Sequence, residues 1–554
     1  MDRRTSLAAL LGRQKKTATA PPAAAVVTSL DPYTGPFGYA EAAHLLRRTT
    51  FGPTKDRIAA AVDAGLENTF ALLFQPEDLP DPPVIFFGDA DPVLSIGDVW
   101  VNAPYASTEQ QAIRQRALSL RAWTFGQWLE EGTSIREKLT LFWHNHFVTS
   151  GVNDPKFVYH YITRLRENAL GNFRELAKMM TVNPAMLRYL NGNQNTKNAP
   201  NENYARELLE LFTIGKGPQV APGDYTTYTE DDVIACAKVL TGWRDRGFFT
   251  DDPEQEVTSQ YVNNRHDLTD KQLSHRFDNQ VITNNGAEEY RDLIDLIFTK
   301  EECAYNICRR LYRWFIYYQI DEQIETDVIA PMAQVLIDND YDIQPALEAL
   351  LRSEHFFDML NFGPMIKNPT DYLISALKVN KVAFPANFTQ AYNAWSRASS
   401  ALAELDMPVL TPPSVAGYPA YYQEPGYYRI WMNSATLPLY SRLAAGLGGP
   451  GYELTGNFSL QIDVLARVQE LDNPTDPNLM IEELANLLFP QGITEGQRNY
   501  LKGILIPGLP DFEWTVEYVD WLENQDDPAL TSAVEGKLRL LWMAMLSMPE
   551  YFLS

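Results

Sequence analysis

The chain has 554 residues, of which 45% are hydrophobic and 12% aromatic, so it can bury a sizeable core and is neither a minimal binding module nor a low-complexity protein. It carries 46 Lys and Arg against 71 Asp and Glu, a formal net charge of −25 at pH 7. This charge repels a phosphate backbone and an anionic membrane surface, so we expect no nucleic-acid partner.

The sequence contains no run of 18 or more apolar residues, which predicts the absence of a transmembrane segment. Its three cysteines form neither an even disulfide framework nor a CxxC pair: Cys236, Cys303 and Cys308. We interpret them as small core side chains and leave their redox state open.

The first residues resemble a twin-arginine export leader, because Arg3 and Arg4 precede the apolar stretch 7–11. Ser6 stands where such a leader usually has a large apolar residue, and Arg13 ends the stretch early. We therefore expect residues 1–30 to lie outside the fold, as a flexible tail or a degenerate leader. Export to the periplasm or envelope is the preferred localisation, and the cytoplasm is the alternative.

From Tyr39 onward the apolar residues recur with helical period. The expected helices, in chain order, cover residues 39–50, 54–74, 107–131, 134–146, 157–180, 204–214, 229–242, 288–319, 325–338, 343–357, 370–379, 480–488, 495–502 and 533–547. Ser134 and Glu137 have the spacing of a capping box, as do Thr229 and Asp232.

Three stretches interrupt this pattern. Residues 76–92 are rich in Pro and Asp, residues 244–286 form an irregular insertion with at most a short hairpin, and residues 408–428 form an ordered surface loop dense in Pro, Gly and Tyr. The fold class is therefore mainly α: a large irregular helical globule with long ordered loops and at most a small β element. Residues 31–450 form its core domain, and residues 451–554 form a helical extension packed on that core.

Three of the seven histidines are expected to be structural or exposed: His160, His275 and His355. His146 falls on the apolar face of its predicted helix and therefore needs a buried partner. His144, two residues earlier, points to roughly the opposite side.

The loop 191–203 contains more Asn and Gln than turn formation requires. It is either a polar recognition surface or a loop whose amides bind its own backbone. The candidate ligand-binding residues are Asn193, Gln194, Asn195, Lys197, Asn198, Asn201, Glu202, Asn203 and Arg206. Directly after them, Glu207 and Glu210 share a helix face, although Arg206 could reduce this group to a salt-bridge network.

Three strings carry a family resemblance: HLLRRTTFGP at 44–53, EKLTLFWHNHF at 137–147, and MLRYLNGNQNTKNAPNENYARELLELFT at 186–213. They resemble a large bacterial family catalogued as a domain of unknown function, number eighteen hundred, over about residues 38–550. The resemblance implies a helical protein, often with a twin-arginine leader and commonly encoded beside a sulfatase-like companion. It supplies no activity and no catalytic residue.

We hypothesise that the chemistry-bearing residues converge on one polar pocket. The candidate catalytic residues are His144, His146, Glu207, Glu210, His266 and Asp267, beside the 193–203 loop. A divalent metal held by His144, His146 and Glu207 is a further option, and any other cofactor is unknown.

Signature motifs of serine hydrolases, P-loop NTPases and zincins are missing from the sequence. The first functional hypothesis is an envelope-associated binding or accessory protein that holds a polar small molecule, a carbohydrate or a protein partner. The second is a hydrolase that uses His and Glu as acid and base or as metal ligands. The third is a structural subunit.

Overall fold

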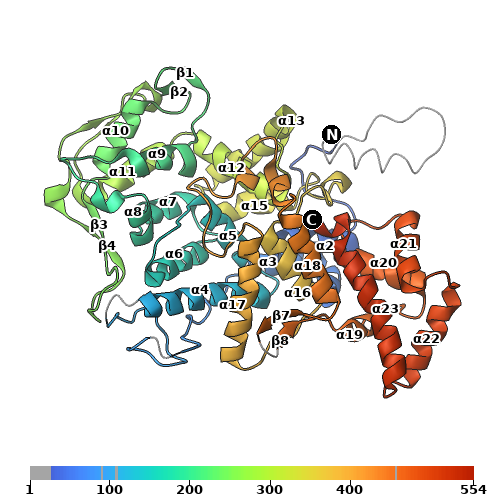
Figure 1. Cartoon of the computed structure of the whole chain (residues 1–554). Helices are drawn as coiled ribbons and strands as arrows, with labels where there is room; N and C mark the ends of the chain where they lie inside the picture. The colour runs from blue at the N-terminus through green and yellow to red at the C-terminus, as the bar shows by residue number, and fades with distance from the viewer. Residues whose placement is uncertain (1–25, 89–90, 107–109, 456–457) are drawn as a thin grey trace.

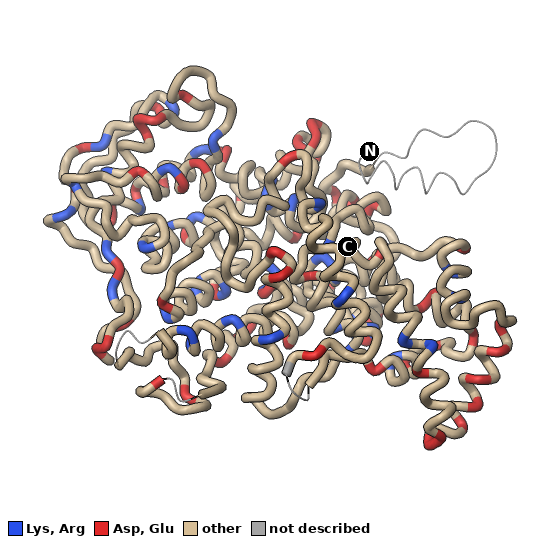
Figure 2. Tube along the Cα trace, in the orientation of Figure 1, with Lys and Arg blue, Asp and Glu red and all other residues tan. Residues whose placement is uncertain are grey.

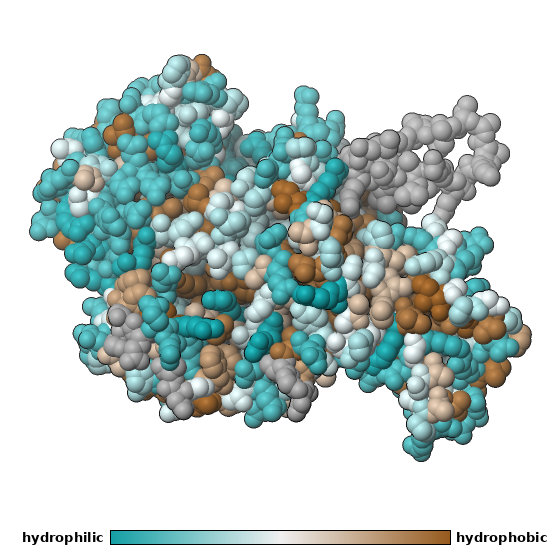
Figure 3. All heavy atoms as spheres, in the orientation of Figure 1, coloured by the Kyte–Doolittle hydropathy of each residue, from teal (hydrophilic) through white to brown (hydrophobic). Residues whose placement is uncertain are grey.

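The computed structural model describes residues 26–88, 91–106, 110–455 and 458–554. Its architecture is mainly α-helical with a few short strands (Figure 1), as the sequence predicts. One continuous hydrophobic cluster runs from Ala42 to Phe552. Hydrophilic residues predominate on the face shown in Figure 3, where apolar residues form small separate groups.

The N-terminal part of the described chain consists of helices and contains one long connection, between α3 and α4. These elements are α2 (Tyr39–Thr49), α3 (Lys55–Leu73), α4 (Gln110–Glu130), α5 (Arg136–His146), α6 (Pro155–Glu167), α7 (Phe173–Thr181), α8 (Pro184–Tyr189), the 3-10 helix η1 (Gly192–Gln194), α9 (Glu202–Glu207) and the π-helix η2 (Leu208–Phe212). The predicted helix 157–180 is two helices, because the Asn172 side chain caps a new helix, α7.

The middle of the chain contains the irregular insertion. This part of the chain comprises β1 (Gln219–Ala221), β2 (Asp224–Tyr225) and α10 (Glu230–Val239), and then, in and around the insertion, β3 (Trp243–Arg246), β4 (Thr258–Tyr261), η3 (Asn263–Arg265), β5 (Lys271–Gln272), η4 (His275–Phe277), β6 (Val281–Ile282) and η5 (Gly286–Glu288). The strands pair antiparallel in twos, and β3 with β4 is the short hairpin expected within 244–286. Thr229 and Asp232 form the predicted capping box of α10.

Helices resume after the insertion. They are α11 (Glu289–Ile297), α12 (Glu302–Phe315), α13 (Glu322–Ile324), the π-helix η6 (Glu325–Ile329), α14 (Ala330–Asp338), α15 (Ile343–Leu351), η7 (Met359–Asn361), α16 (Pro369–Val379), α17 (Phe388–Glu404), η8 (Pro419–Tyr421), η9 (Tyr427–Trp431) and α18 (Thr436–Gly448). The predicted helix 288–319 is two helices, and α17 and α18 were not predicted. The loop 408–428 does not simply cover the surface, because Tyr418, Tyr421 and Tyr428 are buried.

The C-terminal part packs against this body. It contains the hairpin β7 (Tyr452–Thr455) and β8 (Phe458–Leu460), then α19 (Val464–Gln469), α20 (Pro477–Leu488), α21 (Glu495–Leu505), α22 (Asp511–Glu523), α23 (Pro528–Ser547) and η10 (Pro549–Phe552). Helix α23 packs along α18, and Leu553 pairs with Ile366 in an isolated β-bridge. Within the described ranges, no helix is long and apolar enough to cross a membrane.

Residues 26–30, which the sequence places in the tail, belong to the body instead. The Val27 amide donates to Asp358 at 2.9 Å, and Leu30 packs on the core. Residues 1–25, and with them the predicted leader, lie outside the described residues.

The centre of the fold is α5, in which every residue from Glu137 to His146 is buried. The predicted capping box at its start is wrong, because the N-cap is Ile135 and Glu137 binds Arg166 instead of the backbone. The loop 408–428 lies directly on this helix, since the Tyr418 amide donates to the Asn145 side chain at 2.8 Å.

Gly417 makes this contact possible. Its φ is +85°, and a Cβ at this position would overlap the side-chain and backbone oxygens of Asn145. We expect Gly417→Ala to lower the free energy of unfolding by about 2 kcal/mol or more, measured by chemical denaturation. Gly503→Ala is the matched control, because nothing lies within 4 Å of its Cβ and α21 gains a better helix former. Equal effects of the two substitutions would contradict this account.

Candidate functional site

The body of the protein is hollowed by a cleft of about 500 Å³. It lies between α4, the turn that follows α5, the tip of the insertion and the start of the 408–428 loop. Its lining residues are Gln110, Ile113, Arg114, Ala117, Leu120, Arg121, Thr149, Ser150, Gly151, Val152, Asn153, Pro155, Val158, Phe249, Val409, Leu410 and Thr411. We call it the outer cleft.

Two arginines of α4 give the outer cleft its charge. Arg114 and Arg121 are exposed, and among the described residues neither guanidinium has an ion-pair partner. Arg121 is exposed only in part, and its partial burial, together with the positive charge of Arg114, lowers its pKa. By contrast Arg116, on the other side of the same helix, is buried and bound to Asp91 at 2.7 Å. None of the described lining residues is acidic, which makes the outer cleft a local exception in an acidic protein.

An aromatic ring from the insertion completes the wall. Phe249 lines the outer cleft from a left-handed backbone conformation with φ +48°. Its amide donates to the buried carboxylate of Asp154 at 2.8 Å, and its ring packs on Phe248 and Tyr105. Strained aromatic residues persist only where the surroundings hold them, and they gather at functional sites.

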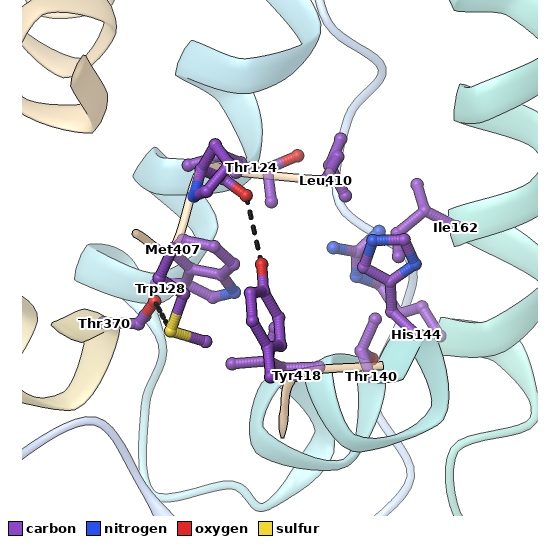
Figure 4. A pocket seen from close by; sticks show the side chains of 13 residues that line it. Thr124, Trp128, Thr140, His144, Ile162, Thr370, Met407, Leu410 and Tyr418 are labelled. Atoms are coloured by element: carbon purple, nitrogen blue, oxygen red, sulfur yellow. Dashed lines mark hydrogen bonds between the residues drawn. The ribbon is translucent and has the colours of Figure 1, made fainter. Parts of the chain in front are cut away.

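A second hollow lies behind the outer cleft, and we call it the inner pocket. The two share Val409 and Leu410 as a common wall. Figure 4 shows His144, Thr140 and Ile162 on one side of the inner pocket and Thr124, Trp128 and Met407 on the other. Its free volume is about 10 Å³, room for one water molecule. Leu410 has φ +58°, so the wall between the two hollows is strained.

His144 presents an unused nitrogen to the inner pocket. The Tyr161 hydroxyl donates to the Phe147 carbonyl, so its oxygen accepts a hydrogen bond from the N–H of His144 Nδ1, 3.0 Å away. This leaves Nε2 as a lone pair without a partner among the described residues. Burial lowers the pKa of His144 to about 4, so the ring is neutral at pH 7.

Arg166 supplies a complementary donor to the same pocket. Its Nε and Nη2 bind both oxygens of Glu137 at 2.6 and 2.9 Å, whereas Nη1 has no partner in the described part of the chain. A water between them would accept from Arg166 and donate to His144. The inner pocket can therefore order and polarise one water molecule.

His146, two residues along α5, has different surroundings. Its Nε2 donates to the Phe212 carbonyl at 3.1 Å, and its ring lies among Phe142, Trp143 and Phe147. Burial, reinforced by the charge of Arg310, lowers its pKa well below the usual value. His146 therefore joins α5 to the π-helix η2 in an apolar setting.

The predicted carboxylates do lie together. Burial and the neighbouring Glu210 raise the pKa of half-buried Glu207. Glu210 accepts from the Tyr228 hydroxyl at 3.0 Å and lies 3.2 Å from Lys216. Arg206 does not pair with Glu207, because it binds Glu230 in two contacts of 2.7 and 2.9 Å.

The Asn-rich loop mostly binds the chain itself. Asn195 donates to the Ala237 carbonyl at 2.8 Å and accepts from the Asn201 amide at 2.9 Å. Asn193 donates to Asp245, and Asn203 donates to the Leu190 carbonyl. The remaining candidates have exposed side chains: Gln194, Lys197, Asn198 and Glu202. Of these four contacts only that between Asn195 and Asn201 lies within the loop, and the other three tie the loop to neighbouring segments.

His266 anchors the insertion. Its Nε2 binds Glu289 Oε2 at 2.9 Å and its Nδ1 donates to the Thr241 carbonyl at 2.8 Å, while Lys271 binds Glu289 Oε1 at 2.5 Å. His266, Lys271 and Glu289 are all fully buried. Asp267 caps the following turn through Thr269. This triad ties the insertion to α11.

The structure thus brings Glu207 and Glu210 together and gives His144, His146 and His266 separate surroundings. Within the described ranges, no group of three or more His, Cys, Asp and Glu side chains has the arrangement of a metal site. His144, His146 and Glu207, the proposed metal ligands, therefore do not form such a group. The three cysteines are free and buried.

Residues 44–553 match the model of a family described as "Protein of unknown function (DUF1800)". The chain belongs to this family. No curated protein and no solved structure matches it significantly. Membership in DUF1800 therefore assigns no reaction, and the geometry of the site carries the functional argument.

Sequence reasoning missed the outer cleft of this DUF1800 protein. Arg114 and Arg121 are seven residues apart, and this spacing predicts that they share one face of the helix. Arg116 belongs to the same helix, however, and only the position of Asp91 shows that it is the paired one. The wall residues Asn153, Phe249 and Thr411 come from three distant segments that no spacing connects.

The low pKa of His144 predicts a pH-dependent stability. Between pH 6.5 and about 4 the His144 ring is protonated in the unfolded state but stays neutral in the folded state. The folded state therefore loses stability as the pH falls through this window. The loss from this one group is on the order of 3 kcal/mol. We expect His144→Gln to remove that part of the slope, measured by urea unfolding at pH 7, 6, 5 and 4.5.

His275→Gln is the control for this experiment, because that ring is exposed by 58%. It should leave the pH slope unchanged. A slope that is the same in the wild type and in His144→Gln would show that the ring is protonated in the folded protein.

Proposed function

We propose that this protein is an envelope-associated binding or accessory protein that holds a polar ligand in the outer cleft. The observation that carries the proposal is a hollow of about 500 Å³ lined by two arginines without ion-pair partners in the described structure and by no described acid. Ligand sites typically have volumes of roughly 300–1,000 Å³ and a few convergent polar groups on an otherwise apolar wall. The proposed ligand site differs from the Asn-rich loop favoured by sequence.

Blocking the outer cleft tests this proposal. Ala117 lies on α4 between the two arginines and lines the cleft, so Ala117→Trp would fill it. A panel of neutral and acidic oligosaccharides and small carboxylates is screened by saturation-transfer NMR. We expect the wild type to bind members of the panel and Ala117→Trp to lose that binding at unchanged melting temperature.

Ala59→Trp is the matched control, because Ala59 is an exposed residue of α3 that does not line the cleft. It should bind as the wild type does. Binding that survives Ala117→Trp, or a wild type that binds no member of the panel, would refute the cleft as a ligand site and favour the structural-subunit alternative.

The envelope part of the proposal rests on Arg3 and Arg4. We expect the full chain, expressed in a bacterium with twin-arginine export, to appear in the periplasmic fraction, and Arg3→Lys with Arg4→Lys to keep it in the cytoplasm. Lys15→Arg with Lys16→Arg preserves the charge outside the arginine pair and should not change export. If the wild-type protein were found only in the cytoplasm, the proposal that it is exported to the envelope would be wrong. The sulfatase-like companion is a further proposed partner, supported by the family resemblance alone.

A hydrolase is the second candidate, and His144 is the observation that favours it. His144 and Arg166 line a hollow that fits one water, directly behind the outer cleft, and His144 Nε2 and Arg166 Nη1 have no partner among the described residues. A ligand in the outer cleft would reach that water only if Val409 and Leu410 moved. The pKa of about 4 makes His144 a weak base, which is why binding is preferred.

A further inference from the structure

We infer that the ligand of the outer cleft is an acidic oligosaccharide, bound through two negatively charged groups about 10 Å apart. This inference rests on the proposed function and names the chemical class of its ligand. It is carried by the spacing of two arginines, the hydroxyl-binding groups between them, and one aromatic wall.

The arginine spacing sets the distance between the acidic groups. Arg114 and Arg121 are separated by seven residues, close to two helical turns, so they share a face and are about 10 Å apart along α4. A single small anion bridges such a pair poorly, whereas a chain with repeated acidic groups meets both. Guanidinium groups also bind carboxylates and other planar anions in a two-point geometry.

The surrounding charge supports a specific rather than a general attraction for anions. The protein as a whole carries −25 and therefore repels polyanions at long range. Helix α4 has no Asp or Glu before Glu130, and its basic positions show as blue segments in Figure 2. An anion in the outer cleft meets both guanidinium groups, and neither has a counter-charge among the described residues.

The remaining lining fits a hydroxyl-rich ligand. Gln110, Ser150 and Asn153 line the outer cleft, and no side-chain hydrogen bond holds them in the described structure. Amide and hydroxyl side chains both donate and accept, as sugar hydroxyls require. A ligand that offered charge alone would leave these groups unused.

Phe249 supplies the face on which a sugar ring packs. The backbone of Phe249 is held at φ +48° by the Asp154 carboxylate, so the ring stays at the wall without a ligand. Aromatic rings present a large rigid apolar surface at small entropic cost. Nucleobases also stack on aromatic rings, but the net charge makes single-stranded nucleic acid the less favoured occupant.

Isothermal titration of the full chain tests the inference. The probes are tetramers of galacturonic, mannuronic and alternating glucuronic acid units, each paired with its carboxyl-reduced neutral counterpart. We expect at least one acidic tetramer to bind, with affinity that falls as salt rises and about tenfold or more above its neutral counterpart. Inorganic phosphate and a tetrameric single-stranded DNA should bind more weakly than that tetramer.

Matched variants locate the effect. Arg114→Gln and Arg121→Gln should each weaken binding of the acidic tetramer about tenfold or more and leave binding of its neutral counterpart unchanged. Arg442→Gln removes the same charge from an exposed arginine of α18 and should have no effect. Phe249→Leu should weaken binding of both tetramers. Melting temperatures confirm that each variant is folded.

Two results would overturn the inference. If wild type binds an acidic tetramer and its neutral counterpart equally, and the arginine variants do the same, the acidic groups are not recognised while the outer cleft still binds carbohydrate. If DNA or phosphate binds more tightly than every acidic tetramer, the ligand class is wrong. Failure of the proposed function is a separate outcome, in which no panel member binds and Ala117→Trp changes nothing.

Discussion

The burial of α5 on all sides is the constraint on which the rest of the structure depends. A polar group inside a protein is costly unless it has a partner, and apart from Thr140, which binds a carbonyl of its own helix, the buried polar side chains of α5 bind neighbouring segments. Those pairs are Glu137 with Arg166 of α6, Lys138 with Asp371 of α16, His144 with Tyr161 of α6, Asn145 with the Tyr418 amide, and His146 with the Phe212 carbonyl. One helix thereby fixes two others, the 408–428 loop and the π-helix η2.

The candidate site follows from that arrangement. Because the 408–428 loop is held on α5, its first residues stand beside α4 and close the wall between the inner pocket and the outer cleft. Arg114 and Arg121 of α4 are exposed at this cleft and have no ion-pair partner among the described residues. The proposal of an anionic ligand rests on these two arginines lying in one hollow that has no described acid.

The two histidines of α5 illustrate how position controls chemistry. Both are neutral because burial disfavours the charged ring. The Nε2 atom of His146 is used by a carbonyl, whereas His144 donates through Nδ1 and keeps Nε2 free beside Arg166. Each ring therefore keeps one nitrogen without a partner among the described residues, but of the two only His144 lines the inner pocket, beside the outer cleft.

The sequence by itself determined the helical fold class, the hairpin-bearing insertion, the cap of α10 and the family. Each of these depends on the spacing of apolar residues along the chain or on a contiguous sequence motif, and both can be recognised without knowing the three-dimensional structure. Tertiary structure alone decided that Glu137 binds Arg166 rather than its own backbone, that His266 binds Glu289, and that the Asn-rich loop is tied to the segments around it. It also decided which arginines of α4 are unpaired, because a buried charge is satisfied by whichever partner the fold brings near, at any distance along the chain.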